Sequence, residues 1–154
     1  MNLARAVLAF LALPGTVAFV VPALLTLRPW PRLDPIGLGP FLLGVTGLLW
    51  CVRSFYVEGK GTLAPWSPPR HLVVTGLYRY SRNPMYGSVV LILWSWAAAF
   101  HSSTHAIYAL AVMAAFHVRV VFGEEPWLAR THGEAWARYR AEVPRWLGRT
   151  RGQA

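Results

Sequence analysis

The stretch GLYRYSRNPMYG, residues 76–87, stands directly before an apolar run that reads VVLILW at 89–94. Asn83 belongs to the residue types that are favoured at the N-cap of a helix. Pro84 suits the first helical position, because its missing N–H would have no partner there and its fixed φ already matches a helix. The stretch therefore predicts that a polar loop ends and an apolar helix begins at Pro84.

Two arginines, Arg79 and Arg82, lie beside this predicted helix start. The first turn of a helix leaves N–H groups unpaired and carries the positive end of the helix dipole, so it favours anions. The same arginines would also serve as a plain anchor at lipid headgroups. From this stretch alone, an anion-binding site and a headgroup anchor are equal interpretations.

The composition is typical of a membrane protein: 55% of the 154 residues are hydrophobic, 14% are charged, and the mean hydropathy is +0.39. A helix needs about 20 apolar residues to cross a bilayer, with about 17 as the lower limit. Four segments qualify, at 3–27, 36–57, 84–100 and 106–122. A signal peptide is the alternative for the first, but its apolar length exceeds a usual signal core. We expect an all-α integral membrane protein, a single domain over residues 1–154 with four transmembrane helices.

The basic residues indicate how the chain is oriented. Of the 15 lysines and arginines, Arg28 and Arg32 lie between the first two spans, and none lies between the last two. The positive-inside rule therefore places both termini, the 58–83 loop and the 123–154 tail in the cytoplasm. Residue usage rich in alanine, arginine and tryptophan suggests a bacterial inner membrane. The net charge of +9 is explained by loops that face anionic headgroups, so we expect membrane lipids and no nucleic acid as partners.

Cysteine and histidine usage argues against a disulfide or a metal site. Cys51 is the single cysteine, lies inside the second span, and is expected to be a small buried residue. His101 and His105 lie in the link on the far side of the membrane, with no acidic residue close in sequence. A histidine pair lacks the remaining ligands of a usual zinc site, so we expect no metal.

The segment after the fourth span begins with two adjacent carboxylates, Glu124 and Glu125. Carboxylates beside lipid usually have a partner or a role. Pairing with Arg119 or a tail arginine is the structural explanation, and ligand binding is the functional one. Further along, apolar and aromatic residues recur at helical spacing: Leu128, His132, Ala135, Trp136, Tyr139 and Val143. This predicts an amphipathic cytoplasmic helix, interrupted at Gly133, whose aromatic face packs on the membrane or on the rest of the protein.

These features together describe a site on one side of the membrane. It combines a cationic helix start, a pair of glutamates and a group of aromatic side chains: Tyr78, Tyr80, Tyr86, Trp127, Trp136 and Tyr139. Carboxylates bind cations or hydroxyls, and aromatic faces suit a cation or a purine. Such a site can hold a ligand that has both negative and positive groups.

The two motifs resemble those of the isoprenylcysteine carboxyl methyltransferase and phospholipid methyltransferase superfamily of small membrane enzymes. The family pattern is roughly Gly-x-Tyr-x-x-x-Arg-His-Pro-x-Tyr-x-Gly, then Glu-Glu-x-x-Leu with Phe-Gly-x-x-Tyr-x-x-Tyr and Val-Pro-Arg. The likeness covers residues 76–146. It implies a multi-helix transmembrane fold that binds S-adenosylmethionine on the cytoplasmic side and methylates a lipophilic acceptor reaching it from the bilayer.

The resemblance implies roles by position. The first motif carries over Arg82, Pro84, Tyr86 and Gly87, and the second carries over Glu124, Glu125, Tyr139 and Arg145. In related enzymes the glutamate pair is associated with cofactor binding. We therefore expect the cofactor site to contain Tyr78, Arg82, Pro84, Tyr86, Gly87, Glu124, Glu125 and Tyr139. We expect Arg82, Asn83 and Arg145 at the reacting groups.

Three departures from the family pattern bear on the chemistry. Asn83 stands where histidine is usual, His132 where phenylalanine is usual, and Trp136 where tyrosine is usual. Asn83 cannot titrate, so a general base at that position is in doubt. Methyl transfer from a sulfonium is a direct displacement whose main requirements are alignment and exclusion of water. A base is needed only for a thiol or amine that arrives protonated, whereas a carboxylate acceptor could be oriented by Arg79, Arg82 or Arg145.

Two other classes of protein are alternatives. Membrane sterol and steroid reductases resemble the C-terminal pattern but use NADPH, and they are usually longer with more spans. A non-enzymatic scaffold or small transporter subunit is the third class, and it predicts that neither glutamate is needed. The acceptor is open among small lipids, quinone-like molecules and thiols, whereas prenylated proteins are not expected.

Overall fold

The computed structural model describes residues 11–26, 33–59 and 71–147, and all regular structure in these ranges is helical. The elements are η1 (Leu11–Val20), α2 (Val21–Leu25), η2 (Pro35–Gly37), α3 (Leu38–Val57), η3 (Gly76–Arg79), α4 (Pro84–Phe100), α5 (Ser103–Arg119), η4 (Val120–Glu124) and α6 (Glu125–Glu142). The predicted all-α class is therefore confirmed for the described part of the chain. Residues 3–10, 27, 60–70 and 148–154 of the predicted segments lie outside it.

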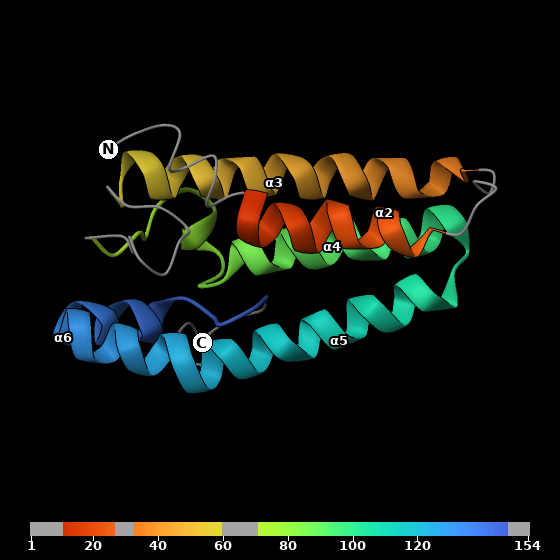
Figure 1. Ribbon diagram of the computed structural model, residues 1–154. Helices are drawn as coiled ribbons and strands as arrows, with labels where there is room; N and C mark the ends of the chain where they lie inside the picture. The colour runs from red at the N-terminus through yellow and green to blue at the C-terminus, as the bar shows by residue number, and fades with distance from the viewer. Residues whose placement is uncertain (1–10, 27–32, 60–70, 148–154) are drawn as a thin grey trace.

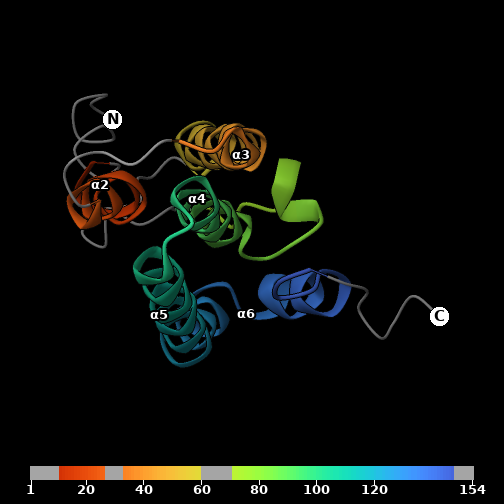
Figure 2. The same ribbon diagram turned by 90° about the vertical axis from the view of Figure 1, so that its right-hand side faces the viewer.

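Helix α4 is the centre of the bundle, with α3 on one side, α5 on another, and η1 and α2 beside it (Figure 2). Its buried residues Val89, Ile92 and Leu93 form the main core together with Ala18, Leu48 and Ala109. Close packing of α3 on α4 depends on two glycines. A Cβ at Gly44 would lie 2.8 Å from Ile92 Cγ1, and one at Gly47 would lie 2.6 Å from Ser88 Oγ.

Helix α4 begins at Pro84 as predicted, with Asn83 at the N-cap position. Contrary to the expectation of a side-chain cap, the Asn83 amide donates to the carbonyl oxygen of Arg145, at 3.0 Å. At the other end of α4, His101 adopts a left-handed conformation with φ 46° and ends the helix. Helix α5 then starts at Ser103, three residues before the predicted start at 106, because the Ser102 hydroxyl caps it by accepting from the His105 N–H.

The fourth predicted span and the first part of the tail helix, up to His132, form one continuous helical rod. Helix α5 passes through the π-helical turn η4 directly into α6, and the backbone leaves helical geometry at Gly133, with φ 49° and ψ −119°. The predicted interruption at Gly133 is therefore present. The rod diverges from α3 and α4 along its length (Figure 1). Space between this rod and the rest of the bundle is where the cavity described below lies.

Within the described residues, two helices are long and apolar enough to cross a membrane, Pro35–Val57 and Ser103–Glu142, while the apolar helices Pro14–Leu25 and Pro84–Phe100 are shorter. Large apolar side chains on the outer faces of α3 and α5 are exposed, among them Leu38, Leu42, Leu43, Leu49, Ile107, Leu110, Met113 and Val118. Exposed apolar surface of this extent is typical of contact with lipid or another apolar partner. Four spans remain a prediction.

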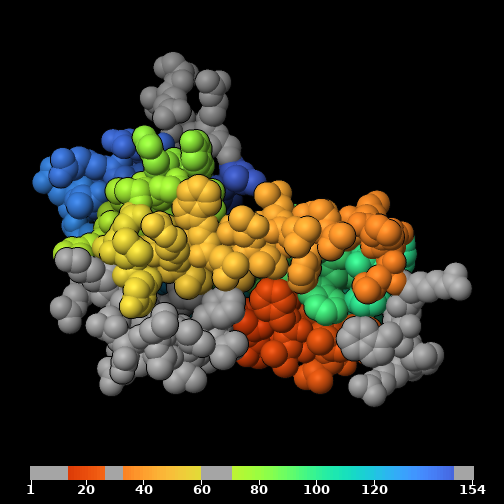
Figure 3. Space-filling view, turned by 90° about the horizontal axis from the view of Figure 1, so that it is seen from above, coloured from red at the N-terminus to blue at the C-terminus, as the bar shows by residue number. Residues whose placement is uncertain are grey.

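The two ends of the bundle differ in character. One end gathers the end of α3, the segment 71–83 and α6 (Figures 1 and 3). The opposite end holds η2 and the turn between α4 and α5, where His101 Nε2 lies 2.8 Å from Asp34 Oδ2. His101 therefore does have an acidic neighbour, which comes from a distant part of the sequence. The two polar sequence motifs both lie at the first end.

Candidate functional site

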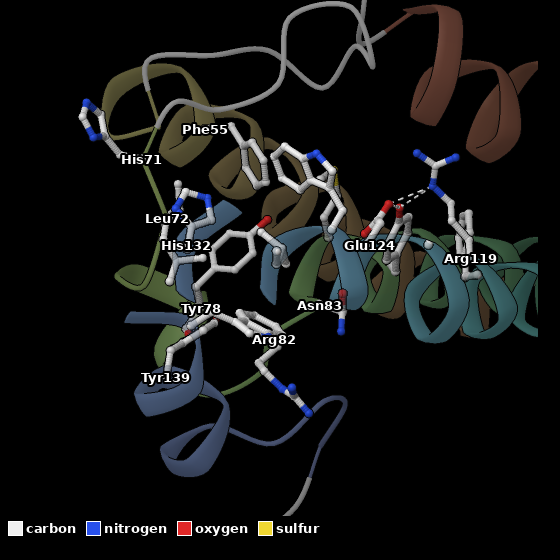
Figure 4. Close-up of a pocket in the computed structure, with 18 of the residues that line it drawn as sticks. Phe55, His71, Leu72, Tyr78, Arg82, Asn83, Arg119, Glu124, His132 and Tyr139 are labelled. Carbon is white, nitrogen blue, oxygen red and sulfur yellow. Dashed lines mark hydrogen bonds and ion pairs between the residues drawn. The ribbon is translucent and has the colours of Figure 1, made fainter. Parts of the chain in front are cut away.

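A cavity of about 700 Å³ lies at the end of the bundle that holds segment 71–83 and α6 (Figure 4). Its volume falls within the range of about 300–1,000 Å³ that is usual for small-molecule sites. Helices η1, α3, α4, α5 and α6 all contribute to its wall. The polar and ionisable side chains of the wall are His71, Tyr78, Arg82, Asn83, Tyr86, Arg119, Glu124, Arg130, His132 and Tyr139.

Glu124 is the acidic residue of the cavity wall. Tyr86 donates its hydroxyl to Glu124 Oε1, and Arg119 Nε donates to the same oxygen at 2.8 Å and to the tyrosine oxygen at 3.1 Å. The Arg119 side chain is 57% exposed and that of Glu124 is 33% exposed. This group is therefore an accessible ion pair at the cavity, and its carboxylate can exchange partners with a ligand at little cost in stability.

Glu125, the next residue, lies outside the cavity wall in a buried ion cluster. Arg145 approaches it with Nε at 2.8 Å and Nη2 at 2.9 Å, which is a bidentate contact, and Arg82 Nη1 lies 3.2 Å from Oε1. The side chains of Glu125 and Arg82 are 10% and 8% exposed. Burial by itself would raise the pKa of Glu125, but hydrogen bonds from Arg145 and the charge of Arg82 outweigh it and hold the pKa below its usual value. Burial lowers the pKa of Arg82, although Glu125 opposes this effect.

The segment that follows α6 is fastened to the start of α4. The Arg82 backbone N–H donates to the Pro144 carbonyl at 2.9 Å, and the Asn83 amide and the Ser81 hydroxyl both donate to the Arg145 carbonyl, at 3.0 and 3.3 Å. These bonds join the first sequence motif directly to the second. Figure 4 shows the Arg82 and Asn83 side chains directed toward this C-terminal segment.

Aromatic residues complete the wall and carry polar atoms that the fold leaves unpaired. The Tyr139 hydroxyl donates to the Tyr78 carbonyl at 2.8 Å, and the Arg82 guanidinium lies 5.4 Å from the centre of the Trp136 ring. Within the described part of the chain, Arg82 Nε and Trp136 Nε1 are buried without a hydrogen-bond partner. The Tyr78 hydroxyl is also buried and has the Cys51 thiol beside it, which is a weak partner. Buried polar atoms usually have a hydrogen-bond partner, and a bound ligand is one group that would supply it.

The structure brings most of the predicted site residues together. The cavity wall includes Tyr78, Arg82, Asn83, Tyr86, Glu124 and Tyr139. The other predicted site residues do not line the cavity: Pro84 and Gly87 belong to the start of α4, and Glu125 and Arg145 form the ion cluster. Both kinds of arginine partner predicted for the glutamates are present: Arg119 pairs with Glu124, and the tail residue Arg145 pairs with Glu125.

Sequence reasoning missed other wall residues. Phe55 on α3 and Met85 on α4 were not expected there, and Arg119 was expected only as a partner of a glutamate. The predicted tail face, by contrast, does point at the site, because Leu128, His132, Trp136 and Tyr139 all line the cavity. Among the residues that the structure describes, no group of three or more potential ligands could hold a metal ion.

The fold and the cavity define a class of all-helical proteins with apolar helices of membrane-spanning length and a ligand-sized site at one end of the bundle. The family model for phospholipid methyltransferases matches residues 36–135, well over half of the 154-residue chain. The chain therefore belongs to the phospholipid methyltransferase family, and the protein is a membrane methyltransferase. No curated protein and no solved structure matches the chain.

Proposed function

We propose that the protein transfers a methyl group from S-adenosylmethionine to a lipophilic acceptor at the cytoplasmic face of the membrane. The observation that carries the proposal is the cavity, whose wall combines an accessible carboxylate, aromatic faces and buried donors at the meeting point of the two family motifs. Family membership supplies the reaction class. The cofactor, the acceptor and the membrane face are the proposed parts.

The polar part of the cavity fits the groups of S-adenosylmethionine. Glu124 offers a carboxylate for ribose hydroxyls or the amino group, at the cost of loosening a surface ion pair. Trp127 and Trp136 offer faces for an adenine ring. Arg82 Nε and Trp136 Nε1 are donors that could serve the cofactor's carboxylate after small side-chain movements. When bound, the cofactor supplies an electrophilic methyl group on a positively charged sulfur.

The deeper part of the cavity suits an apolar acceptor. Its wall there consists of Pro14 and Val17 from η1, Met85 and Val89 from α4, and Phe116 from α5. These helices are apolar along their length, so this part of the wall adjoins the region that we assign to the bilayer. An apolar chain inserted here would place its head group near Tyr86 and Glu124, which line the same cavity.

The chain's own contribution is positioning and exclusion of water, which is the main requirement of a direct displacement. We propose that Arg82, Asn83 and Arg145 serve this purpose by holding the wall in place. The Asn83 amide and the Arg145 guanidinium are each committed to the bonds between the start of α4 and the C-terminal segment. Four spans with both termini in the cytoplasm would place this end of the bundle at the cytoplasmic surface.

Binding and turnover in lipid nanodiscs test the proposal. We expect S-adenosylhomocysteine to raise the melting temperature of the purified protein and NADPH to leave it unchanged. We also expect label from methyl-labelled S-adenosylmethionine to enter a total bacterial lipid extract. Glu124→Gln should weaken the S-adenosylhomocysteine shift, while Glu134→Gln on the outer face of α6 serves as the matched control. Stabilisation by NADPH and none by S-adenosylhomocysteine would instead identify a reductase.

A further inference from the structure

A methyl acceptor that arrives with a proton on its nucleophile needs a residue to take that proton, and the cavity wall limits the choice. This inference rests on the proposed function. The titratable and charged side chains that face the cavity are His71, Tyr78 and Arg82 from the segment before α4, Tyr86 from α4, Arg119 and Glu124 from α5 and η4, and Arg130, His132 and Tyr139 from α6.

Most of these groups are poor proton acceptors. The three arginines are permanently charged donors. Burial raises the pKa of Tyr78, and it also raises that of Tyr139, so both hydroxyls stay protonated. The hydroxyl of Tyr86 is already donated to Glu124.

Glu124 and Asn83 are excluded as the proton acceptor for other reasons. The proposed function already assigns Glu124 to the cofactor, and its Oε1 accepts hydrogen bonds from both Tyr86 and Arg119. Asn83 has no proton-accepting nitrogen, and its amide donates to the Arg145 carbonyl. His71 and His132 therefore remain as candidate proton acceptors.

The two histidines differ in their placement. His71 is exposed, and Figure 4 shows its ring directed away from the other labelled side chains. His132 is partly buried and lies one helical turn after Leu128, and both line the cavity together with Trp136, which follows the break at Gly133. Its ring meets the edge of Trp127, with the ring centres 6.1 Å apart and the planes at 86°. In the described part of the chain neither ring nitrogen of His132 has a hydrogen bond or ion pair to the protein, so both are available to a ligand.

We propose that His132 accepts the proton that the acceptor loses during methyl transfer, and therefore that the acceptor is an amine, hydroxyl or thiol rather than a carboxylate. In this step the acceptor's nucleophilic atom forms a bond to the methyl carbon as the carbon–sulfur bond breaks onto sulfur. The proton of that nucleophilic atom passes to an unprotonated ring nitrogen of His132. From there it leaves to water, and neutral S-adenosylhomocysteine is released.

Three proteins in nanodiscs test this assignment: the unmodified chain, His132→Gln and the control His101→Asn, which removes an exposed histidine at the opposite end of the bundle. The probes are methyl-labelled S-adenosylmethionine and a total bacterial lipid extract. We expect His132→Gln to bind S-adenosylhomocysteine within about twofold of the unmodified protein but to transfer methyl groups about 100-fold more slowly, as is usual on removal of a general base. The unmodified protein should lose kcat/KM on acidification, and His132→Gln should lack this dependence. His101→Asn should transfer methyl groups as the unmodified protein does.

A second readout does not depend on turnover. With histidine labelled for NMR, the resonance that disappears in His132→Phe identifies His132, and it should shift when S-adenosylhomocysteine is added. Phenylalanine is the residue usual at this position in the family pattern, so this variant should fold. Unchanged transfer and an unchanged pH profile in His132→Gln would overturn the inference while leaving the proposed function intact. Failure of the unmodified protein to bind S-adenosylhomocysteine would overturn both.

Discussion

The adjacent glutamates Glu124 and Glu125 should respond in opposite ways to the same substitution. In Glu125→Gln the buried cluster loses its negative charge, and Arg82, whose side chain is 8% exposed, keeps an uncompensated positive charge. Removal of one partner from a buried ion pair typically costs about 3–5 kcal/mol. Arg145 is 33% exposed and can recover water, and the glutamine oxygen can still accept one hydrogen bond. We therefore expect the lower end of that range, about 3 kcal/mol.

Glu124→Gln is the matched comparison, because it makes the same chemical change one residue away. Its partner Arg119 is 57% exposed, and exposed ion pairs contribute about 0–1 kcal/mol. Thermal unfolding followed by circular dichroism in detergent should thus show a melting temperature lower by roughly 6–12 °C for Glu125→Gln. Glu124→Gln should melt within about 4 °C of the unmodified protein.

For ligand binding we expect the opposite ranking of the two variants, with the larger loss in Glu124→Gln. Glu124→Gln should weaken S-adenosylhomocysteine binding at least about tenfold, because a hydrogen bond to a charged group contributes about 1.5–3 kcal/mol. Glu125→Gln, assayed well below its melting temperature, should bind with a smaller loss. If Glu124→Gln lowered the melting temperature as much as Glu125→Gln, the separation of roles between the two residues would be refuted.

Three further predictions concern stability and topology. Gly44→Ala should destabilise the protein by about 1–3 kcal/mol, because its Cβ would lie 2.8 Å from a side-chain carbon of α4, whereas Gly39→Ala, whose Cβ meets no described atom within 4 Å, should not. Folding lowers the pKa of Glu125, so its ionised carboxylate stabilises the protein at any pH above the ordinary pKa of 4.5. This stabilisation is lost as the pH falls through the lower pKa of the folded state. On acidification the melting temperature of Glu125→Gln should therefore fall less than that of the unmodified protein. In right-side-out membrane vesicles an impermeant maleimide should label Ser103→Cys directly but Tyr80→Cys only after permeabilisation, and the opposite pattern would contradict the proposed orientation.

The features that could be predicted from the sequence are those that depend on local chemistry. Helix α4 starts at Pro84 because proline has a fixed φ and lacks an N–H, and both conditions are local. The backbone departs from the helix at Gly133 because only glycine adopts a positive φ without steric cost. Local spacing also accounts for two pairs in the tail, Leu128 with His132 before Gly133 and Trp136 with Tyr139 after it, since residues three or four apart lie on one side of a helix.

The features that could not be predicted depend on contacts between distant segments. The sequence predicts Asn83 as a helix cap, but its side-chain amide donates to the carbonyl of Arg145, 62 positions away. The glutamates read as a pair, yet adjacent residues on a helix point about 100° apart. The two side chains are separated in this way because the helix from α5 to α6 is continuous at Glu124 and Glu125, whereas the predicted fourth span ended at residue 122. The contact of His132 with Trp127 is local to α6, but the cavity that His132 lines is formed by distant segments and required the tertiary fold.

The bonds between the start of α4 and the segment after α6 also determine when the cavity wall can be completed during synthesis. Arg82 and Asn83 find their carbonyl partners only on Pro144 and Arg145, and Glu125 receives its bidentate arginine from the same place. During synthesis the apolar helices can therefore enter the bilayer long before the cavity has its final wall. If the proposed function holds, the nascent chain acquires its affinity for a cofactor only after Arg145 has left the ribosome.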